Sequence, residues 1–304
     1  MNYKSILNLL GILLVIFSLS FIPPLMLSVF YDEPLNGIFL YSFLFLITLG
    51  CLMWFTSRQK DLPLNISDGF IITTMFWVVL AFAGSIPFYF SGLNASDAIF
   101  ESVSGITTTG ATVIVGLDEL PKSLLLYRQL LQWIGGMGLI ILAVAVMPTL
   151  GIGGGQLYKM ELPGSHGNQK LTPKITDSAK ALWKIYFGLT IICALLYLLS
   201  GMNLFDAIAH SLSTVAGGGF STHDDSIGFF DSGLIETVCI IFMLLSAASF
   251  AVHYAAIFGG KPLKYFYDSE FRFFLSVVIS IAIIILVFHT VNDSYAELLL
   301  ALRA

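Results

Sequence analysis

Long apolar stretches separated by short polar segments dominate the chain. Seven of them are long enough to cross a bilayer, which takes about 20 helical residues. The seven predicted spans are residues 6–30, 37–56, 69–90, 123–150, 181–199, 233–258 and 271–291. Pro23 and Pro24 are expected to kink or end the first span near the outer surface, because proline lacks a backbone N–H donor. The pattern predicts an all-α polytopic membrane protein with about seven transmembrane helices.

Two further stretches, residues 97–115 and 206–222, are about as long but poorly suited to lipid. They contain acidic residues or histidine, several serines and threonines, and glycine near the end. We expect each to be re-entrant, with a short pore helix that enters the membrane and an extended segment that returns to the same side. Such backbone is tolerated only where protein shields it or where it lines a wet pore.

The distribution of basic residues favours the re-entrant arrangement. With seven crossings and two re-entrant segments, all but three of the 14 lysines and arginines fall on the inner side, together with the N-terminus. The three outer ones are Lys122, Arg128 and Arg303. Inner loops of membrane proteins carry this excess of positive charge, so the predicted topology is consistent with the rule.

The two unusual stretches are copies of one another. Residues 91–111 read SGLNASDAIFESVSGITTTGA, and residues 200–220 read SGMNLFDAIAHSLSTVAGGGF. At an offset of 109, nine of the 21 positions are identical, where average composition gives roughly one match by chance. Each copy has a full span before and after it, so the repeating unit is predicted to be span, pore helix, return loop and span, in the same orientation both times.

The duplication divides the chain into five parts. They are two extra N-terminal helices (1–62), a first pore unit (63–150), a cytosolic loop (151–180), a second pore unit (181–260) and a partial third unit (261–304). In the third unit, residues 271–291 are the expected first span and residues 292–302 the expected start of a short helix.

The segments that follow the two short helices are candidates for an ion-selectivity filter. They are Thr107, Thr108, Thr109 and Gly110 in the first copy and Ala216, Gly217, Gly218 and Gly219 in the second. A helix C-terminus carries partial negative charge, which favours a cation beyond it, and aligned backbone carbonyls can replace the hydration shell of potassium. Gly110, which aligns with Gly219, is the expected centre of the filter. The alternative interpretation is an ordinary turn rich in glycine and threonine.

Three polar residues are candidates for supporting the loops. Glu101 aligns with His210, and both are expected to brace the return loops from the pore helices; the alternative is a polar group that is merely satisfied in a buried pocket. Arg128 either faces an acid such as Glu101 or Asp97 or snorkels to the outer interface, and we favour snorkelling. Asp224 and Asp225 either attract cations to the entrance or belong to a solvated loop.

The composition excludes several classes of protein. Hydrophobic residues make up 57% of the chain and charged residues 11%, against roughly a quarter charged in soluble domains. The net charge of −5 offers no basic face for nucleic acid. No metalloprotease motif, paired catalytic carboxylates or nucleophile triad is present, so we expect no enzyme and no covalently bound cofactor. Membrane lipid is the expected environment.

The loop motifs resemble a known family. ESVSGITTTGAT with the following QWIGGMGLIILAVAVMPTLG, and HSLSTVAGGGFSTHDDSIGFF, are similar to the Trk/Ktr/HKT superfamily of potassium transporters, and the two extra helices resemble its TrkH/TrkG branch. The resemblance implies four pore units around one pore, with potassium held by the carbonyls of Thr108, Thr109, Gly217 and Gly218. It also implies a bacterial inner-membrane location, a homodimer and a cytosolic, nucleotide-binding TrkA-like regulatory subunit.

The expected function is potassium uptake through a carbonyl-lined pore, driven by the interior-negative membrane potential. The sequence departs from the family pattern because it contains two units and part of a third, without the gating loop of the third unit. One alternative is therefore a non-conducting fragment that needs another chain to complete the pore. The other is a secondary transporter coupled to sodium or protons, although no acidic residue is expected in mid-span.

Overall fold

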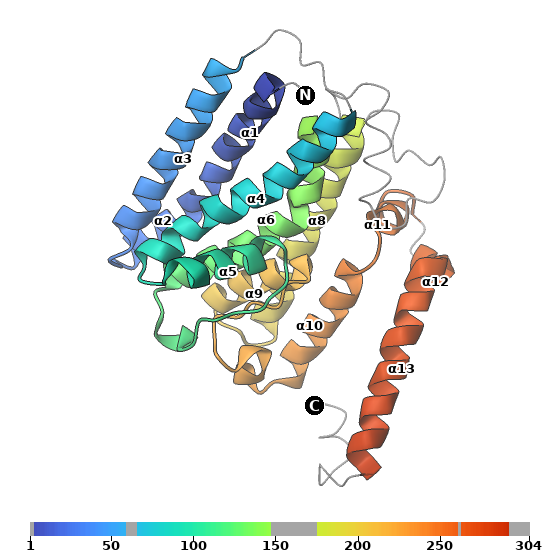
Figure 1. Ribbon diagram of the computed structural model, residues 1–304. Helices are drawn as coiled ribbons and strands as arrows, with labels where there is room; N and C mark the ends of the chain where they lie inside the picture. The colour runs from blue at the N-terminus through green and yellow to red at the C-terminus, as the bar shows by residue number, and fades with distance from the viewer. Residues whose placement is uncertain (1–2, 59–65, 147–174, 261–262, 292–304) are drawn as a thin grey trace.

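The computed structural model describes residues 3–58, 66–146, 175–260 and 263–291 (Figure 1). Within these ranges the regular elements are all helices, which confirms the all-α prediction. The α-helices are α1 (Tyr3–Ser18), α2 (Ile22–Phe30), α3 (Asn36–Thr56), α4 (Ile66–Phe90), α5 (Ala95–Ile106), α6 (Lys122–Val146), α8 (Ile175–Leu199), α9 (Leu204–Ala216), α10 (Gly233–Ser246), α11 (Phe250–Ile257), α12 (Lys264–Tyr267) and α13 (Ser269–Val291). In the same ranges, three 3₁₀ turns join them, η1 (Leu19–Phe21), η2 (Leu117–Glu119) and η5 (Ser226–Phe230).

Five helical stretches in the described ranges are long and apolar enough to cross a membrane. They are Tyr3–Phe30, Asn36–Thr56, Asp68–Phe90, Ala181–Leu199 and Ser269–Phe288, and they coincide with five of the predicted spans. The predicted span 123–150 corresponds to α6, but residues 147–150 lie outside the described residues, as do most of the predicted cytosolic loop and residues 292–302. The count of seven spans therefore stays a prediction.

The first span is interrupted where the prolines occur. Helix α1 ends at Ser18, the turn η1 follows, and α2 begins at Ile22 with proline in its first turn. A proline in the first turn of a helix costs little, because the amide that it lacks would have no partner there. The expected kink at Pro23 and Pro24 thus takes the form of a helix restart.

The prediction of one continuous helical span over residues 233–258 is wrong. Helix α10 ends at Ser246, Ser249 has extended backbone angles (φ −62°, ψ 143°), and α11 begins at the next residue. The imidazole of His253 lies 3.0 Å from the carbonyl oxygen of Leu245, which a continuous helix would pair with a backbone amide further along. The Leu245 oxygen also accepts from the Ala248 amide at 3.0 Å, so a tightened last turn and the imidazole together satisfy it where the apolar run is divided between two helices.

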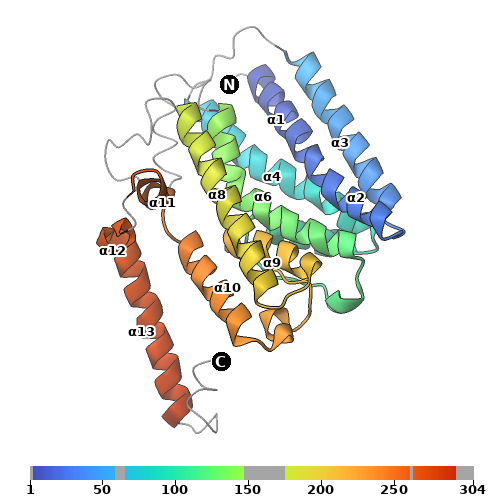
Figure 2. The same cartoon turned by 180° about the vertical axis from the view of Figure 1, so that it is seen from behind.

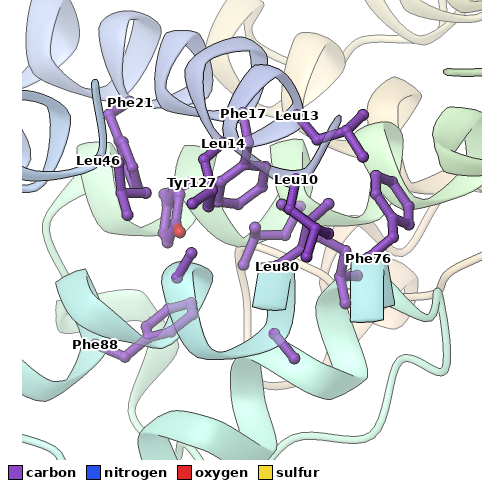
Figure 3. Close-up of a cluster of buried hydrophobic side chains, with 14 of the residues drawn as sticks. Leu10, Leu13, Leu14, Phe17, Phe21, Leu46, Phe76, Leu80, Phe88 and Tyr127 are labelled. Atoms are coloured by element: carbon purple, nitrogen blue, oxygen red, sulfur yellow. The ribbon is translucent and has the colours of Figure 1, made fainter. Parts of the chain in front are cut away.

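Helices α1 and α3 pack at very short range through two glycines. A Cβ atom added to Gly11 would lie 2.8 Å from the Gly50 carbonyl oxygen, and one added to Gly50 would lie 2.8 Å from the Gly11 carbonyl oxygen. Figure 3 shows part of the cluster of buried side chains to which α1, η1, α3, α4 and α6 contribute, Tyr127 of α6 among them. The Tyr127 hydroxyl donates to the Gly84 carbonyl oxygen across 2.8 Å, which satisfies its polar end within the apolar cluster.

The two short helices lie among the long ones. Helix α5 packs on α4 and α6, whereas α9 packs on α6, α8 and α10. We call residues 94–115 the first hairpin and residues 203–224 the second hairpin; each consists of a short helix and the return segment that follows it. In Figures 1 and 2, α13 stands apart at the edge of the molecule away from α1 and α3. Only 6% of its most apolar stretch is buried.

Candidate functional site

The short helices of the two hairpins begin with the same cap. The side-chain oxygen of Asn94 accepts from the Asp97 amide at 2.9 Å, and its Nδ2 donates to the Asp97 carboxylate at 2.6 Å. Asn203 and Asp206 repeat both bonds at the same two distances. These bonds satisfy amides that a helix start leaves free, so the duplicated Asn-x-x-Asp spacing fixes where each short helix begins.

The two return segments follow the same backbone path. The φ angles are positive at equivalent positions, 55° at Thr108 and 67° at Gly217, then 78° at Gly110 and 89° at Gly219. The hydrogen bonds that end the helices also match at the offset of 109: Thr108 N to Gly105 O, Thr109 N to Ser104 O, Gly217 N to Thr214 O and Gly218 N to Ser213 O. Sequence identity over the return segments is low, so the backbone geometry is the stronger evidence for duplication.

The two return segments touch at their matched glycines. A Cβ atom added to Gly110 would lie 1.9 Å from the Gly218 carbonyl oxygen and 3.6 Å from the Gly219 Cα. No side chain fits at position 110, and its positive φ disfavours one as well. The structure therefore brings Gly110, Gly218 and Gly219 together, although 109 residues separate the matched positions.

A buried ion pair braces the first return segment. Arg128 Nη2 lies 3.1 Å from Glu101 Oε1, and both side chains are fully buried. Thr112 donates to the same carboxylate oxygen and accepts from Arg128 Nη2 at 3.0 Å. The favoured prediction that Arg128 snorkels is wrong. The contact confirms the alternative that Arg128 faces Glu101. The carboxylate compensates a positive charge that would be very costly to bury without a partner.

Helix α6 also holds the second return segment. Arg128 Nη1 donates to the Ser221 carbonyl oxygen at 3.0 Å. One turn later, Gln132 Oε1 accepts from the Ser213 hydroxyl at 2.7 Å and from the Phe220 amide at 3.1 Å. A single face of α6 thus contacts both hairpins.

His210 occupies the position that Glu101 has in the first hairpin. Its Nδ1 lies 2.9 Å from the Asp206 carbonyl oxygen and its Nε2 lies 2.9 Å from the Ser221 hydroxyl. Ser221 is the equivalent of Thr112 at the offset of 109. Each short helix therefore bonds its own return segment at the same place, through a carboxylate in one hairpin and an imidazole in the other.

A cavity of about 350 Å³ opens between the return segments. Its lining includes Gly110, Thr112, Gly219, Ser221 and Asp224. The Asp224 carboxylate accepts from the amides of Gly116 and Leu117 at 3.0–3.1 Å. This acid, which was a candidate for attracting cations, thus ties the second hairpin to the segment that follows the first.

Comparison with known proteins identifies the family. The family model for TrkH, described as a cation transport protein, matches residues 37–300. The chain belongs to the TrkH family. It is 47% identical over 302 residues to a Trk system potassium uptake protein TrkH of Vibrio parahaemolyticus, covering 98% of this chain and 62% of that one. It is 44% identical to the protein of the same name from Escherichia coli K12, covering 97% and 62%.

A solved structure agrees with the fold of this TrkH-family chain. The crystal structure of the potassium transporter TrkH from Vibrio parahaemolyticus superposes with a TM-score of 0.86 at 44% identity, and it covers 100% of this chain and 62% of that one. The chain thus spans about 62% of the length of the relatives that it matches. The family and the apolar helices make it a membrane protein, and the names of these relatives describe transport rather than catalysis.

Gln132 is a site residue that the sequence analysis missed. It is fully buried, and its side chain packs so closely on Gly218 that a Cβ there would lie 2.3 Å from Gln132 Cδ. The available signal was a pair of glutamines, Gln129 and Gln132, inside an otherwise apolar span, since polar groups at such depth are costly unless they have a role.

Proposed function

We propose that the chain contributes to potassium uptake across the bacterial inner membrane, with the two return segments forming part of a selectivity filter. The contact of Gly110 with Gly218 and Gly219 carries this proposal, because it places two segments of equal backbone geometry side by side. The names of the relatives, which describe potassium uptake, support the choice of ion.

The hairpins are proposed to be re-entrant from the outer side, with the N-terminus in the cytoplasm. Helices α5 and α9 have 12 and 13 residues, too few to cross a bilayer of about 30 Å at 1.5 Å per residue. In Figure 1 the chain leaves the end of α4, passes α5 and η2, and enters α6 from the same end of the molecule. The excess of lysine and arginine on the opposite side supports this orientation.

Backbone carbonyls are the proposed ligands for the dehydrated ion. We assign Thr108 and Thr109 of the first hairpin and Gly217 and Gly218 of the second to this role, with Thr107, Gly110, Ala216 and Gly219 as their filter neighbours. The helix ends next to them place partial negative charge on the ion side. Potassium is the substrate here and not a resident cofactor.

Two hairpins supply half of a four-part ring of carbonyls. A second candidate function is therefore that of an assembly component whose pore is completed by further pore units. A cytosolic TrkA-like regulatory subunit and a homodimer remain part of the proposal. The word "system" in the names of the relatives is consistent with additional subunits.

Rubidium uptake into proteoliposomes tests the proposal. We expect uptake by the wild-type chain and its loss in Gly110→Ala, because the new methyl group would collide with the Gly218 carbonyl. Gly92→Ala is the matched control, since Gly92 also has a positive φ (115°) but has open space around its Cβ position and lies outside the return segments. Equal uptake by both variants would overturn the filter assignment, and no uptake by a folded wild-type chain would favour the second candidate.

A further inference from the structure

His223 lies between two carboxylates at the outer end of the hairpins. Its Nδ1 contacts the Asp118 carboxylate, and its Nε2 lies 3.2 Å from Asp206 Oδ2. The ring stacks on Phe229 with a centroid distance of 3.5 Å and an interplanar angle of 6°. Both ring nitrogens and one ring face are thus engaged.

The two carboxylates come from different parts of the repeat. Asp118 is in η2, which follows the first hairpin, whereas Asp206 is in the first turn of α9. Next to this site, the Asp224 amide donates to Asp118 Oδ2 at 3.3 Å. His223 therefore joins the segment after the first hairpin to the second hairpin.

This junction does not follow from the duplication. At the offset of 109, the equivalent of His223 is Ile114 and the equivalent of Asp118 is Ile227, and neither can form an ion pair. The caps and helix ends repeat in both copies, whereas His223 and Asp118 occur once. They belong to the interface between the copies and not to the inherited hairpin.

An imidazole donates from both ring nitrogens only when it carries two protons and a positive charge. With one proton, it would direct a lone pair at one of the two carboxylates, and that contact would be lost. We propose that charged His223 is a positioning residue that ties the second hairpin to the segment after the first, so that the relative placement of the return segments depends on outer pH; this inference rests on the proposed pore function.

The surroundings of His223 permit such a response. The Asp118 side chain is 45% exposed and the His223 side chain 16%, so protons from the medium reach the pair. Other ionisable groups close by are Asp224, His210, whose ring centroid is 6.5 Å away, and Arg128, which bonds Ser221 O on the same return segment.

The direction of the response follows from the two partners. The hydrogen bond from His223 lowers the pKa of Asp118. The stabilisation that this acid provides is therefore present above its pKa in the unfolded chain, about 3.9, and is lost as the pH falls through its lower pKa in the folded state. The bridge also needs a proton on both ring nitrogens of His223, so losing one of these protons removes one of the two contacts. The tie is therefore strongest in weakly acidic medium and weakens toward alkaline pH.

Thermal unfolding of the full chain in detergent tests the tie without transport. From pH 6 to pH 8.5 we expect the wild-type midpoint to fall by about 2 °C more than that of His223→Gln. Asp118→Asn should lose much of the same slope, and it carries the test if His223→Gln does not fold. Asp225→Asn is the matched control, because it removes an exposed acid two residues from His223 and should keep the wild-type slope.

Rubidium uptake at the same outer pH values completes the experiment. Wild-type uptake should fall at least twofold toward pH 8.5, and His223→Gln should flatten the profile. A slope difference in unfolding without any wild-type uptake would contradict the proposed function but support the tie. Equal unfolding slopes in the wild type and His223→Gln, or an unchanged uptake profile in that variant, would overturn the inference.

Discussion

Arg128 donates to the carbonyl oxygen of Ser221 across 3.0 Å, although Arg128 follows the first hairpin and Ser221 lies in the second. The same guanidinium contacts Glu101 and Thr112 of the first hairpin, and it stacks on Phe220 at 4.3 Å. One fully buried side chain thus connects both return segments. The filter geometry that we propose depends on α6 as much as on the hairpins themselves.

Removing Arg128 alone should be more damaging than removing it together with its partner charge. Arg128→Met leaves the Glu101 carboxylate buried without compensation, and we expect a loss of about 3–5 kcal/mol in the free energy of unfolding. Adding Glu101→Gln to this variant should recover part of the loss, because a neutral amide is less costly to bury. Unfolding midpoints of the two single variants and the double variant check this, and simple additivity of the two losses would contradict it.

Much of the fold was accessible from the hydrophobic pattern, whereas the details of the site depend on tertiary contacts. Five span predictions coincide with helices to within a few residues, because lipid imposes apolarity over a fixed length. The break between α10 and α11 was invisible, since residues 247–249 are Ala, Ala and Ser, without the proline or glycine that marks such points. His253 and Leu245 reveal it only in three dimensions.

The wrong prediction for the Arg128 side chain has a similar origin. Its partner Glu101 is 27 positions away in the sequence and on another helix, so the local pattern does not reveal the ion pair and favoured snorkelling. By contrast, the matched glycines were found by comparing the two copies, and the structure places them in contact. Duplication therefore reveals what the hairpins share, but not how helix α6 holds them.

Gln132 and Gln129 should respond in opposite ways to the same substitution. Gln132→Leu removes the acceptor for the Ser213 hydroxyl and the Phe220 amide, so we expect a loss of about 1–3 kcal/mol and reduced rubidium uptake. Gln129 is equally buried, yet among the described residues neither of its side-chain amide atoms has a hydrogen-bond partner. Gln129→Leu should thus be neutral or stabilising. Equal losses in the two variants, measured as unfolding midpoints, would show that Gln132 has no particular role in the second return segment.

Thr108 and Gly217 occupy the first position of positive φ in the two return segments. Exchanging threonine and glycine there should show how much backbone strain a side chain adds. Thr108 has a φ of 55°, which is unfavourable for a β-branched residue, whereas Gly217 holds the equivalent angle of 67° without a side chain. Gly217→Thr should cost about 1–3 kcal/mol, while Thr108→Gly should stay within ~1 kcal/mol of wild type. A collision does not account for the difference, because a Cβ at Gly217 would meet its nearest neighbour, Ser246 Oγ, at 3.4 Å. Unfolding midpoints check both values, and a larger loss in Thr108→Gly would contradict the strain argument.

The glycine contact between α1 and α3 should tolerate no added methyl group. A Cβ at Gly11 would lie 2.7 Å from the Trp54 amide nitrogen and 2.8 Å from the Gly50 carbonyl oxygen, and backbone atoms cannot move aside as side chains do. Gly11→Ala should therefore separate the two helices and lower the free energy of unfolding by about 1–3 kcal/mol. Gly188→Ala in α8 is the control, since open space surrounds its Cβ position and alanine favours a helix over glycine by up to about 1 kcal/mol. Equal unfolding midpoints for the two variants would mean that α1 and α3 do not approach as closely as the structure places them.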